Sequence, residues 1–316
     1  MSIEKINMEN TLSQVSPTSI AHSYDKLLVT LKVSSIYFHY RTGYERPDNP
    51  YFGATIGRVA NRIENGTFQI GNQRYSVAKN VLGKHSLHGG ERGFDKVMWT
   101  VEKGCNEVRM TYYSRDGESG FPGNVKTTVC FKLTNDNKLI INYQATADRC
   151  TPISLTNHAY FNLAGHVSST HRPQPLISKN PNWCEIKSVS GTEFDLRELQ
   201  PLGAAIQRTF HSYGFDLNYV INSNEDKSNF HLKFTWAICG HFTDQPGVQF
   251  YTTNSLAPIP GKEGVLYDKH SAFCLETQKF PDALHHVREE NLRLHDEDMW
   301  LRKSVINFLL PLIPNI

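Results

Sequence analysis

Short runs in which apolar and polar side chains alternate dominate this sequence, and this periodicity restricts the fold more than any other feature. Residues 125–133, VKTTVCFKL, place Val, Thr, Val, Phe and Leu on one side and Lys, Thr, Cys and Lys on the other. A turn cluster, TNDN, follows, and an extended apolar pattern resumes over residues 138–146. A period of two is typical of a half-buried strand, so these runs predict an antiparallel hairpin.

Other extended runs predict further strands, at residues 27–37, 67–77, 108–113, 230–236 and 248–253. Between residues 50 and 280 no stretch repeats apolar residues at three and four over several turns, so long helices are not expected there. Only the tail from Pro281, with EENLRLHDEDMWLRK, has helical character. Many short strands joined by Gly, Pro, Asn and Ser predict an all-β sandwich. Since no linker or repeat divides the 316 residues, we expect one domain.

The composition excludes several functional classes. Formal net charge is only +2, with acidic and basic residues mixed, which does not favour binding of nucleic acid or an acidic membrane surface. The six cysteines form no CxxC pair and no zinc or disulfide spacing, so we expect reduced thiols. The N-terminus lacks a secretory pattern, and the apolar residues 305–313 are far fewer than the roughly 20 of a spanning helix. These observations predict a cytoplasmic protein that acts on a small neutral molecule.

Three titratable residues lie where the sequence suggests a site. His158, in TNHAYF, stands among asparagines and aromatics that would fix the ring and its tautomer, as a general acid requires. Glu276 follows the apolar Phe-Cys-Leu run, where partial burial would raise its pKa. His88 precedes paired glycines that permit a sharp turn. Taken singly, residues of these types are more often structural, as a core or surface histidine or a salt-bridged glutamate.

Further polar side chains complete a possible pocket. GRVANRI contributes Asn61 and Arg62, GFDLNY contributes Asp216, and PGVQFY contributes Gln249. Carboxylates, imidazoles, a guanidinium and amides together suit a polyhydroxylated neutral ring. The sequence therefore indicates acid–base chemistry on a sugar.

Seven motifs resemble, in the same order, those of the aldose 1-epimerase (galactose mutarotase) family: FGATIGRVANRIENG, LHGGERGFDKVMW, DGESGFPGNV, TPISLTNHAYFNLAG, GFDLNY, QPGVQFYTTN and CLETQKFPD. The resemblance spans about residues 51–282. It implies a large antiparallel β-supersandwich formed by one domain, residues 1–316, with a sugar site in a cleft. It also implies an isomerase that interconverts the α and β anomers of free aldohexoses such as galactose and glucose. No cofactor and no metal are expected, and the chain would be a monomer or weak dimer.

The resemblance also assigns roles to individual residues. Glu276 matches the family's catalytic base and His158 its acid, so activity would require ionised Glu276 and protonated His158. His88 matches a second histidine that binds and polarises the sugar near its ring oxygen. The matches to sugar-binding positions are Asn61, Arg62, Tyr160, Asp216 and Gln249.

Some segments depart from the family pattern. Residues 1–50 and 283–316 diverge, and the connection at 165–191 is shorter than in the family. The segment before PGVQFY lacks the usual basic, polar approach, and Leu217 stands where the family usually has histidine. These departures leave two alternatives open. One is a sugar-binding or regulatory homologue with impaired catalysis. The other is a hexose-6-phosphate 1-epimerase-like relative, which would need basic residues to meet the phosphate, and the sequence shows no dedicated cluster.

Overall fold

The computed structural model describes residues 41–136, 138–162, 186–198, 200–221, 230–233, 238–261, 264–286, 293–294 and 299–309. These residues form β-strands, two short α-helices, α2 (Arg41–Tyr44) and α3 (Leu202–Arg208), and 3-10 turns at Glu64–Gly66, Phe94–Lys96, Glu118–Gly120, Phe210–Ser212 and Ala283–His285. The prediction of an all-β fold without long helices is confirmed for this part of the chain. The expected strand at 27–37 and most of the connection at 165–191 lie outside it.

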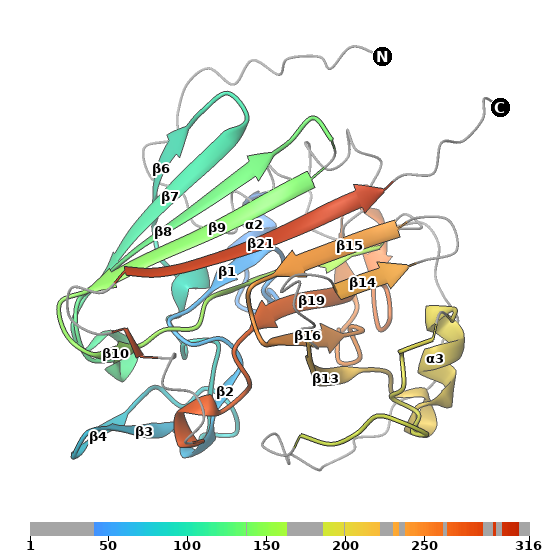
Figure 1. The fold of residues 1–316 in the computed structure, drawn as a ribbon, viewed down its shortest axis with the longest axis horizontal. Coiled ribbons are helices and arrows are strands. Elements are labelled where there is room, and N and C mark those ends of the chain that lie inside the picture. The colour runs from blue at the N-terminus through green and yellow to red at the C-terminus, as the bar shows by residue number, and fades with distance from the viewer. Residues whose placement is uncertain are drawn as a thin grey trace.

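A seven-stranded antiparallel sheet forms the larger layer (Figure 1). In spatial order its strands are β14 (Phe230–Lys233), β15 (Ile238–Thr243), β21 (Met299–Leu309), β9 (Lys138–Ala147), β8 (Val125–Leu133), β7 (Glu107–Ser114) and β6 (Thr100–Lys103). The predicted hairpin is confirmed, because β8 and β9 pair from Val125 opposite Ala147 to Leu133 opposite Leu139.

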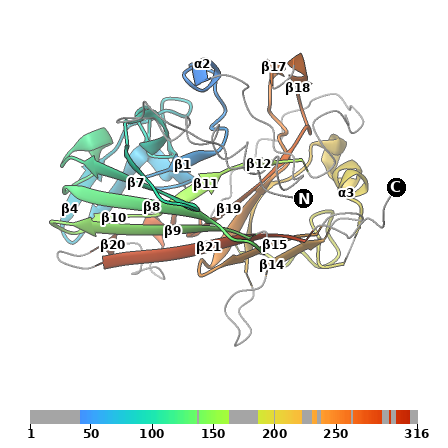
Figure 2. The ribbon, with the colours of Figure 1, turned by 90° about the horizontal axis from the view of Figure 1, so that it is seen from above.

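A four-stranded sheet lies against this layer, and Figure 2 shows β19 beside the larger sheet. Its order is β12 (Tyr160–Phe161), β19 (Phe273–Gln278), β16 (Gly247–Tyr251) and β13 (Asp216–Val220). Two-stranded pairs complete the fold: β1 (Ala54–Ile56) with β11 (Thr156–His158), β2 (Arg62–Ile63) with β5 (Ser86–Leu87), β3 (Thr67–Ile70) with β4 (Gln73–Ser76), β10 (Thr151–Pro152) with β20 (Arg293–Leu294), and β17 (Ile259–Pro260) with β18 (Leu266–Tyr267).

The main hydrophobic core lies between the two sheets. Val129 and Ile141 from the larger sheet share one cluster of buried side chains with Phe250 and Leu275 from the smaller sheet. Burial of such side chains contributes about 1.5–3 kcal/mol each. The alternation seen in the sequence therefore positions β16 and β19, and with them the candidate site.

Two predictions made from local pattern are wrong. Apart from the 3-10 turn at Ala283–His285, the tail from Pro281 is not helical where it is described, since Arg293–Leu294 and Met299–Leu309 are the strands β20 and β21. Strand β21 pairs with β9 on one side and β15 on the other, and these ladder hydrogen bonds override the local helical propensity. The run at 67–77 is a hairpin rather than one strand, because Gly71 adopts φ 57° between β3 and β4.

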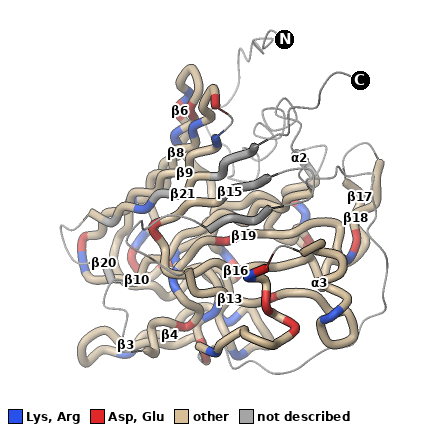
Figure 3. The backbone as a smooth tube through the Cα atoms, turned by 45° about the vertical axis from the view of Figure 1, so that its right-hand side comes forward, with Lys and Arg blue, Asp and Glu red and all other residues tan. Residues whose placement is uncertain are grey.

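Charged residues of both signs are interspersed along the tube in Figure 3, in line with the small net charge. Among the described residues, none of the helices has the length and apolar character needed to cross a membrane.

Candidate active site

Three buried side chains, His88, His158 and Glu276, converge from separate elements, with potential ligand atoms within 4.8 Å of one another. His158 ends β11, Glu276 lies in β19, and His88 follows β5. The strand register explains why His158 and Glu276 converge, because β12 pairs antiparallel with β19 and sets Tyr160 opposite Cys274. His158 lies two residues before Tyr160, and Glu276 lies two residues after Cys274. The antiparallel pairing therefore brings His158 and Glu276 together.

His158 and Glu276 form a buried acid–base pair. Their side chains are 6% and 3% exposed, and Nε2 of His158 lies 3.5 Å from Oε1 of Glu276. Nδ1 of His158 and Oε2 of Glu276 have no hydrogen-bond partner within the described residues. Because a buried polar atom without a partner is unfavourable, these two atoms indicate a place for a polar ligand.

Burial shifts both members of the pair. It raises the pKa of Glu276 to about 8, an effect that the Asp216 carboxylate increases and Arg62 opposes. It lowers the pKa of His158 to about 4. The sugar-free protein therefore favours a proton on Glu276 and a neutral His158, the reverse of the distribution expected from the sequence. The two distributions carry the same number of protons and differ only in which residue holds the exchangeable one.

His88 presents a hydrogen-bond donor to the site. Its Nδ1 accepts a bond of 3.2 Å from the backbone N–H of Asn61, so the neutral ring carries its proton on Nε2. Burial lowers its pKa well below the ordinary value and keeps the ring neutral. Gly89 makes this position possible, because a Cβ there would lie 1.9 Å from the carbonyl oxygen of Gly57.

The spacing of His88, His158 and Glu276 resembles that of a His₂Glu metal site. Metal ligation requires a lone pair on each imidazole, however, and the nitrogen of His88 left for a ligand is protonated. This donor set suits a hydrogen-bonding ligand better than a cation.

A chain of amide hydrogen bonds lines one side of the site. Asn61 Nδ2 donates to Gln249 Oε1 at 3.1 Å, and Gln249 Nε2 donates to Asp216 Oδ1 at 2.7 Å. Gln249 pairs with Glu276 across the β16–β19 ladder, which places this chain beside the acid–base pair. Burial raises the pKa of Asp216, and the bond from Gln249 opposes that shift. Leu217 follows Asp216 on β13 and so faces the other side of the sheet.

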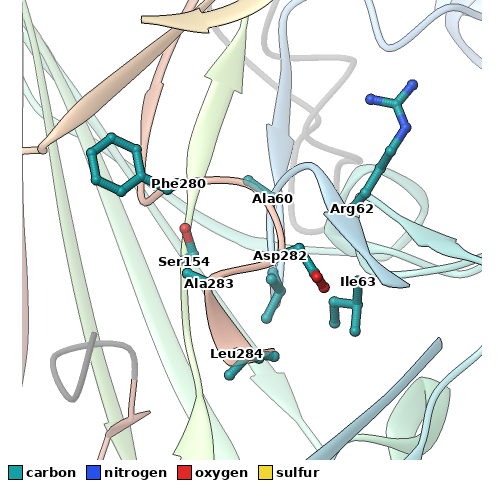
Figure 4. Close-up of a pocket in the computed structure, with 9 residues that line it drawn as sticks. Ala60, Arg62, Ile63, Ser154, Phe280, Asp282, Ala283 and Leu284 are labelled. Atoms are coloured by element: carbon teal, nitrogen blue, oxygen red, sulfur yellow. The ribbon is translucent and has the colours of Figure 1, made fainter. Parts of the chain in front are cut away.

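Arg62 is held through its backbone by the segment that follows β19. The Asp282 N–H donates to the Arg62 carbonyl at 3.0 Å, and the Glu64 N–H donates to Asp282 Oδ1 at 2.7 Å. Figure 4 shows the Arg62 side chain extending away from the Asp282 carboxylate. Arg62 Nη1 also donates to Asn61 Oδ1 at 3.4 Å. One chain segment thus carries Glu276 and fixes the backbone of Arg62.

Two small cavities flank these elements, and neither is lined by His158 or Glu276. The first contacts the backbone side of Arg62, between Ser154 and Asp282 (Figure 4). The second lies between the sheets, against Tyr143 and Thr277. We place the candidate site by its chemistry, because titratable groups and unpartnered polar atoms gather at the His158–Glu276 pair.

Tyr160 lies beside the acid–base pair through its ring, while its hydroxyl is engaged by the backbone. Its hydroxyl donates to the Pro50 carbonyl at 2.6 Å, and its ring stacks on His158 with centroids 5.0 Å apart. Tyr51 was not among the predicted site residues, yet its ring stacks on His158 with centroids 5.8 Å apart. Its position directly before the motif FGATIGRVANRI was the signal available.

Comparisons with known proteins identify the family of this chain. A family model described as Aldose 1-epimerase matches residues 27–304. Galactose mutarotase from Homo sapiens is 42% identical over 275 residues, covering 81% of this chain and 80% of that protein. Aldose 1-epimerase from Haemophilus influenzae is 34% identical over 257 residues, covering 76% and 75%. The solved GalM/aldose epimerase homologue from C. elegans has a TM-score of 0.76 at 26% identity, covering 87% of each chain.

The chain belongs to the aldose 1-epimerase family, whose members are isomerases that interconvert sugar anomers. The large antiparallel β-sandwich predicted from the resemblance is confirmed by the solved relatives. The family model extends beyond residues 51–282 at both ends and reaches into β21.

Proposed function

We propose that this protein is an aldose 1-epimerase that interconverts the α and β anomers of free aldohexoses, galactose and glucose among them, with Glu276 and His158 as its acid–base pair. The observation that carries the proposal is the buried pair itself, 3.5 Å apart, with one unpartnered polar atom on each side chain within the described residues. The names of the relatives support galactose as a substrate.

The chemistry needs two positioned groups. A base removes the proton of the anomeric hydroxyl while an acid protonates the ring oxygen, and the ring opens to an aldehyde. Rotation about the C1–C2 bond and closure on the other face give the second anomer. Each group contributes about 10²–10⁴-fold to the rate. In the ionised form Glu276 is the base and His158 the acid, and a proton shift within the pair reaches this form from the neutral one.

The remaining polar groups suit recognition of sugar hydroxyls. His88 offers the N–H of Nε2, which can polarise an oxygen of the ring. Asn61 and Gln249 orient the Asp216 carboxylate, an acceptor for hydroxyl protons. Arg62 adds positive charge near Asp216 and Glu276, and this charge opposes the rise in pKa of both carboxyl groups.

Polarimetry tests the proposal. Fresh α-D-glucose and α-D-galactose should reach anomeric equilibrium faster with the purified protein than in buffer alone, and calorimetry should detect binding of both sugars. Binding without faster equilibration would instead support a sugar-binding homologue. A preference for the 6-phosphates would support the second alternative.

We also propose that residues 1–316 act as one cytoplasmic domain, a monomer or weak dimer that binds neither nucleic acid nor membranes. The continuous family match and the mixed surface charge support this proposal, as do the free thiols of Cys105, Cys130 and Cys274. Light scattering after gel filtration, with and without a reductant, measures the mass in solution.

A further inference from the structure

Two tyrosine rings lie nearly parallel to the imidazole of His158. Tyr160 stacks at 5.0 Å with an interplanar angle of 13°, and Tyr51 stacks at 5.8 Å with an angle of 16°. The two tyrosines are linked through the backbone, because the Tyr160 hydroxyl donates to the carbonyl of Pro50, the residue before Tyr51. We call Tyr51, His158 and Tyr160 the tyrosine–histidine stack.

The backbone of Tyr51 is in the left-handed region, with φ 65°. This conformation is uncommon for a bulky side chain and costs about 1–3 kcal/mol, so it persists only where the surroundings enforce it. Those surroundings include His158, since the Gly53 N–H donates to its carbonyl at 3.0 Å, and the Tyr51 carbonyl accepts from Ala54 at 3.0 Å. The contacts that enforce the conformation thus belong to the same segment as the proposed acid.

Tyr51 also contacts the other groups around the pair. Its ring meets His88 edge-on at 4.9 Å, and the Lys96 ammonium lies 5.0 Å from its centroid. Lys96 in turn pairs with Asp95 at 2.7 Å. The cation–π contact and the edge contact hold the ring from two further directions. These contacts together hold the Tyr51 ring beside His88 and His158.

We propose that Tyr51 is a positioning residue that holds the His158 imidazole in the orientation needed for proton exchange with Glu276 and the sugar. The inference rests on the proposed epimerase function. Tyr160 occupies one stacking position, and without the Tyr51 ring the imidazole loses the second and can turn about its χ2 bond. A misoriented imidazole slows proton transfer without weakening sugar binding.

Two substitutions at one position test this role. Tyr51→Leu removes the ring and Tyr51→Phe keeps it, while both variants retain a Cβ at the same positive φ. We expect Tyr51→Leu to lower kcat at least about tenfold with KM within about twofold, and Tyr51→Phe to stay within about twofold in both. A structural role alone would not separate kcat from KM in this way.

A double-mutant cycle shows whether Tyr51 acts through His158. In a His158→Asn background, Tyr51→Leu should lower the residual kcat less than about twofold, because the ring to be oriented is absent. An undiminished tenfold loss in that background would overturn the proposal. So would a rise in KM at constant kcat, which would make Tyr51 a sugar contact, or an equal loss in Tyr51→Phe, which would assign the effect to the hydroxyl.

A spectroscopic measurement separates this inference from the proposed function. The ring protons of His158 should shift in the NMR spectrum of Tyr51→Leu, relative to wild type and Tyr51→Phe, because a ring current is lost. If the wild type does not equilibrate sugars but the shift is seen, the stack stands and the epimerase proposal fails. If Tyr51→Leu does not fold, Lys96→Met takes its place, and there an unchanged kcat and unchanged His158 shifts would overturn the proposal.

Discussion

The β8–β9 hairpin and the β16–β19 pair are both antiparallel ladders, but they differ in how far their polar side chains are buried. Along β8, buried and more accessible residues alternate, and the inward side chains are mainly apolar. In β19 all six residues are buried, including Glu276. A carboxylate in such a place opposes folding, since desolvation penalises its charge. The β8–β9 ladder therefore serves as the scaffold. The β16–β19 ladder contains a buried carboxyl group that lowers stability, and we attribute its presence to chemistry on a ligand.

The largest expected effect is on the chemistry of β19. Glu276→Gln should lower kcat by about 10²–10⁴-fold while sugar affinity stays near normal, because the amide cannot accept the proton of the anomeric hydroxyl but keeps the shape of the carboxyl group. Polarimetry and calorimetry measure the two quantities. Glu107→Gln, on the scaffold strand β7, is the matched control and should leave both unchanged. Undiminished turnover in Glu276→Gln would remove this residue from the proposed role.

Ile141→Ala in β9 should produce the converse result. The side chain is 1% exposed, so its loss should lower the free energy of unfolding by about 2–5 kcal/mol. Because Ile141 lies on the β8–β9 ladder and not in the candidate site, kcat per folded molecule should not change. Lys126→Ala, at an exposed position of β8, is the control for urea denaturation. A loss of kcat as large as the loss of stability would contradict the division between the two ladders.

Residues that bind the sugar should give intermediate effects. Asp216→Ala and Arg62→Ala should raise KM by about 10–100-fold, at least as much as they lower kcat, because they remove contacts made in the ground state as well as the transition state. Leu217→Ala, on the opposite side of β13, should leave KM within about twofold. A pure kcat effect at Asp216 or Arg62 would contradict the binding assignment.

The pH dependence of stability should distinguish wild type from Glu276→Gln. The pKa of Glu276 rises from 4.5 to about 8 on folding, so the folded state retains a proton that the unfolded state loses, and stability falls as pH rises through this range. His158, lowered from 6.5 to about 4, acts in the opposite sense below pH 6.5. From pH 6.5 to 8 only Glu276 of the two contributes. Urea unfolding should therefore show wild type losing stability relative to Glu276→Gln over that interval, and parallel curves would contradict the buried carboxylate.

Tyr160→Phe should have the smallest effect. It removes the bond from the hydroxyl to Pro50 but keeps the ring that stacks on His158, so we expect a loss of about 1 kcal/mol in stability. KM should not change, because the hydroxyl is already engaged within the protein. A large rise in KM would show instead that the hydroxyl reaches the sugar.

Alternation made several strands predictable. The runs at 125–133 and 138–146 correspond to β8 and β9, and those at 108–113 and 248–253 fall on β7 and β16 with small differences at their ends. The signal failed at β21, where charged residues within an eleven-residue strand suggested a helix. Pairing with β9 and β15 decides that strand, and such pairing is invisible in a local pattern.

The candidate site, like the strands, could be predicted from the sequence only in part. Its residue types and their order in the motifs could be identified from the sequence, as could the partial burial of Glu276. The stacking of Tyr51 on His158 could not be predicted, because a position beside a motif does not reveal a ring contact with a residue far away in the sequence. The neutral state of His158 in the sugar-free protein was also not predicted, since desolvation depends on atoms from several strands.

The sequence by itself determined an all-β chain, the family to which it belongs and the side chains available for acid–base chemistry. Only the tertiary structure decided that His158 and Glu276 meet, that an amide chain orients Asp216, and that two tyrosine rings stack on the imidazole. The physical reason is the separation along the chain over which each effect acts. Alternation and turn chemistry act between neighbours in the chain, whereas register and burial are set by strands far apart in the sequence.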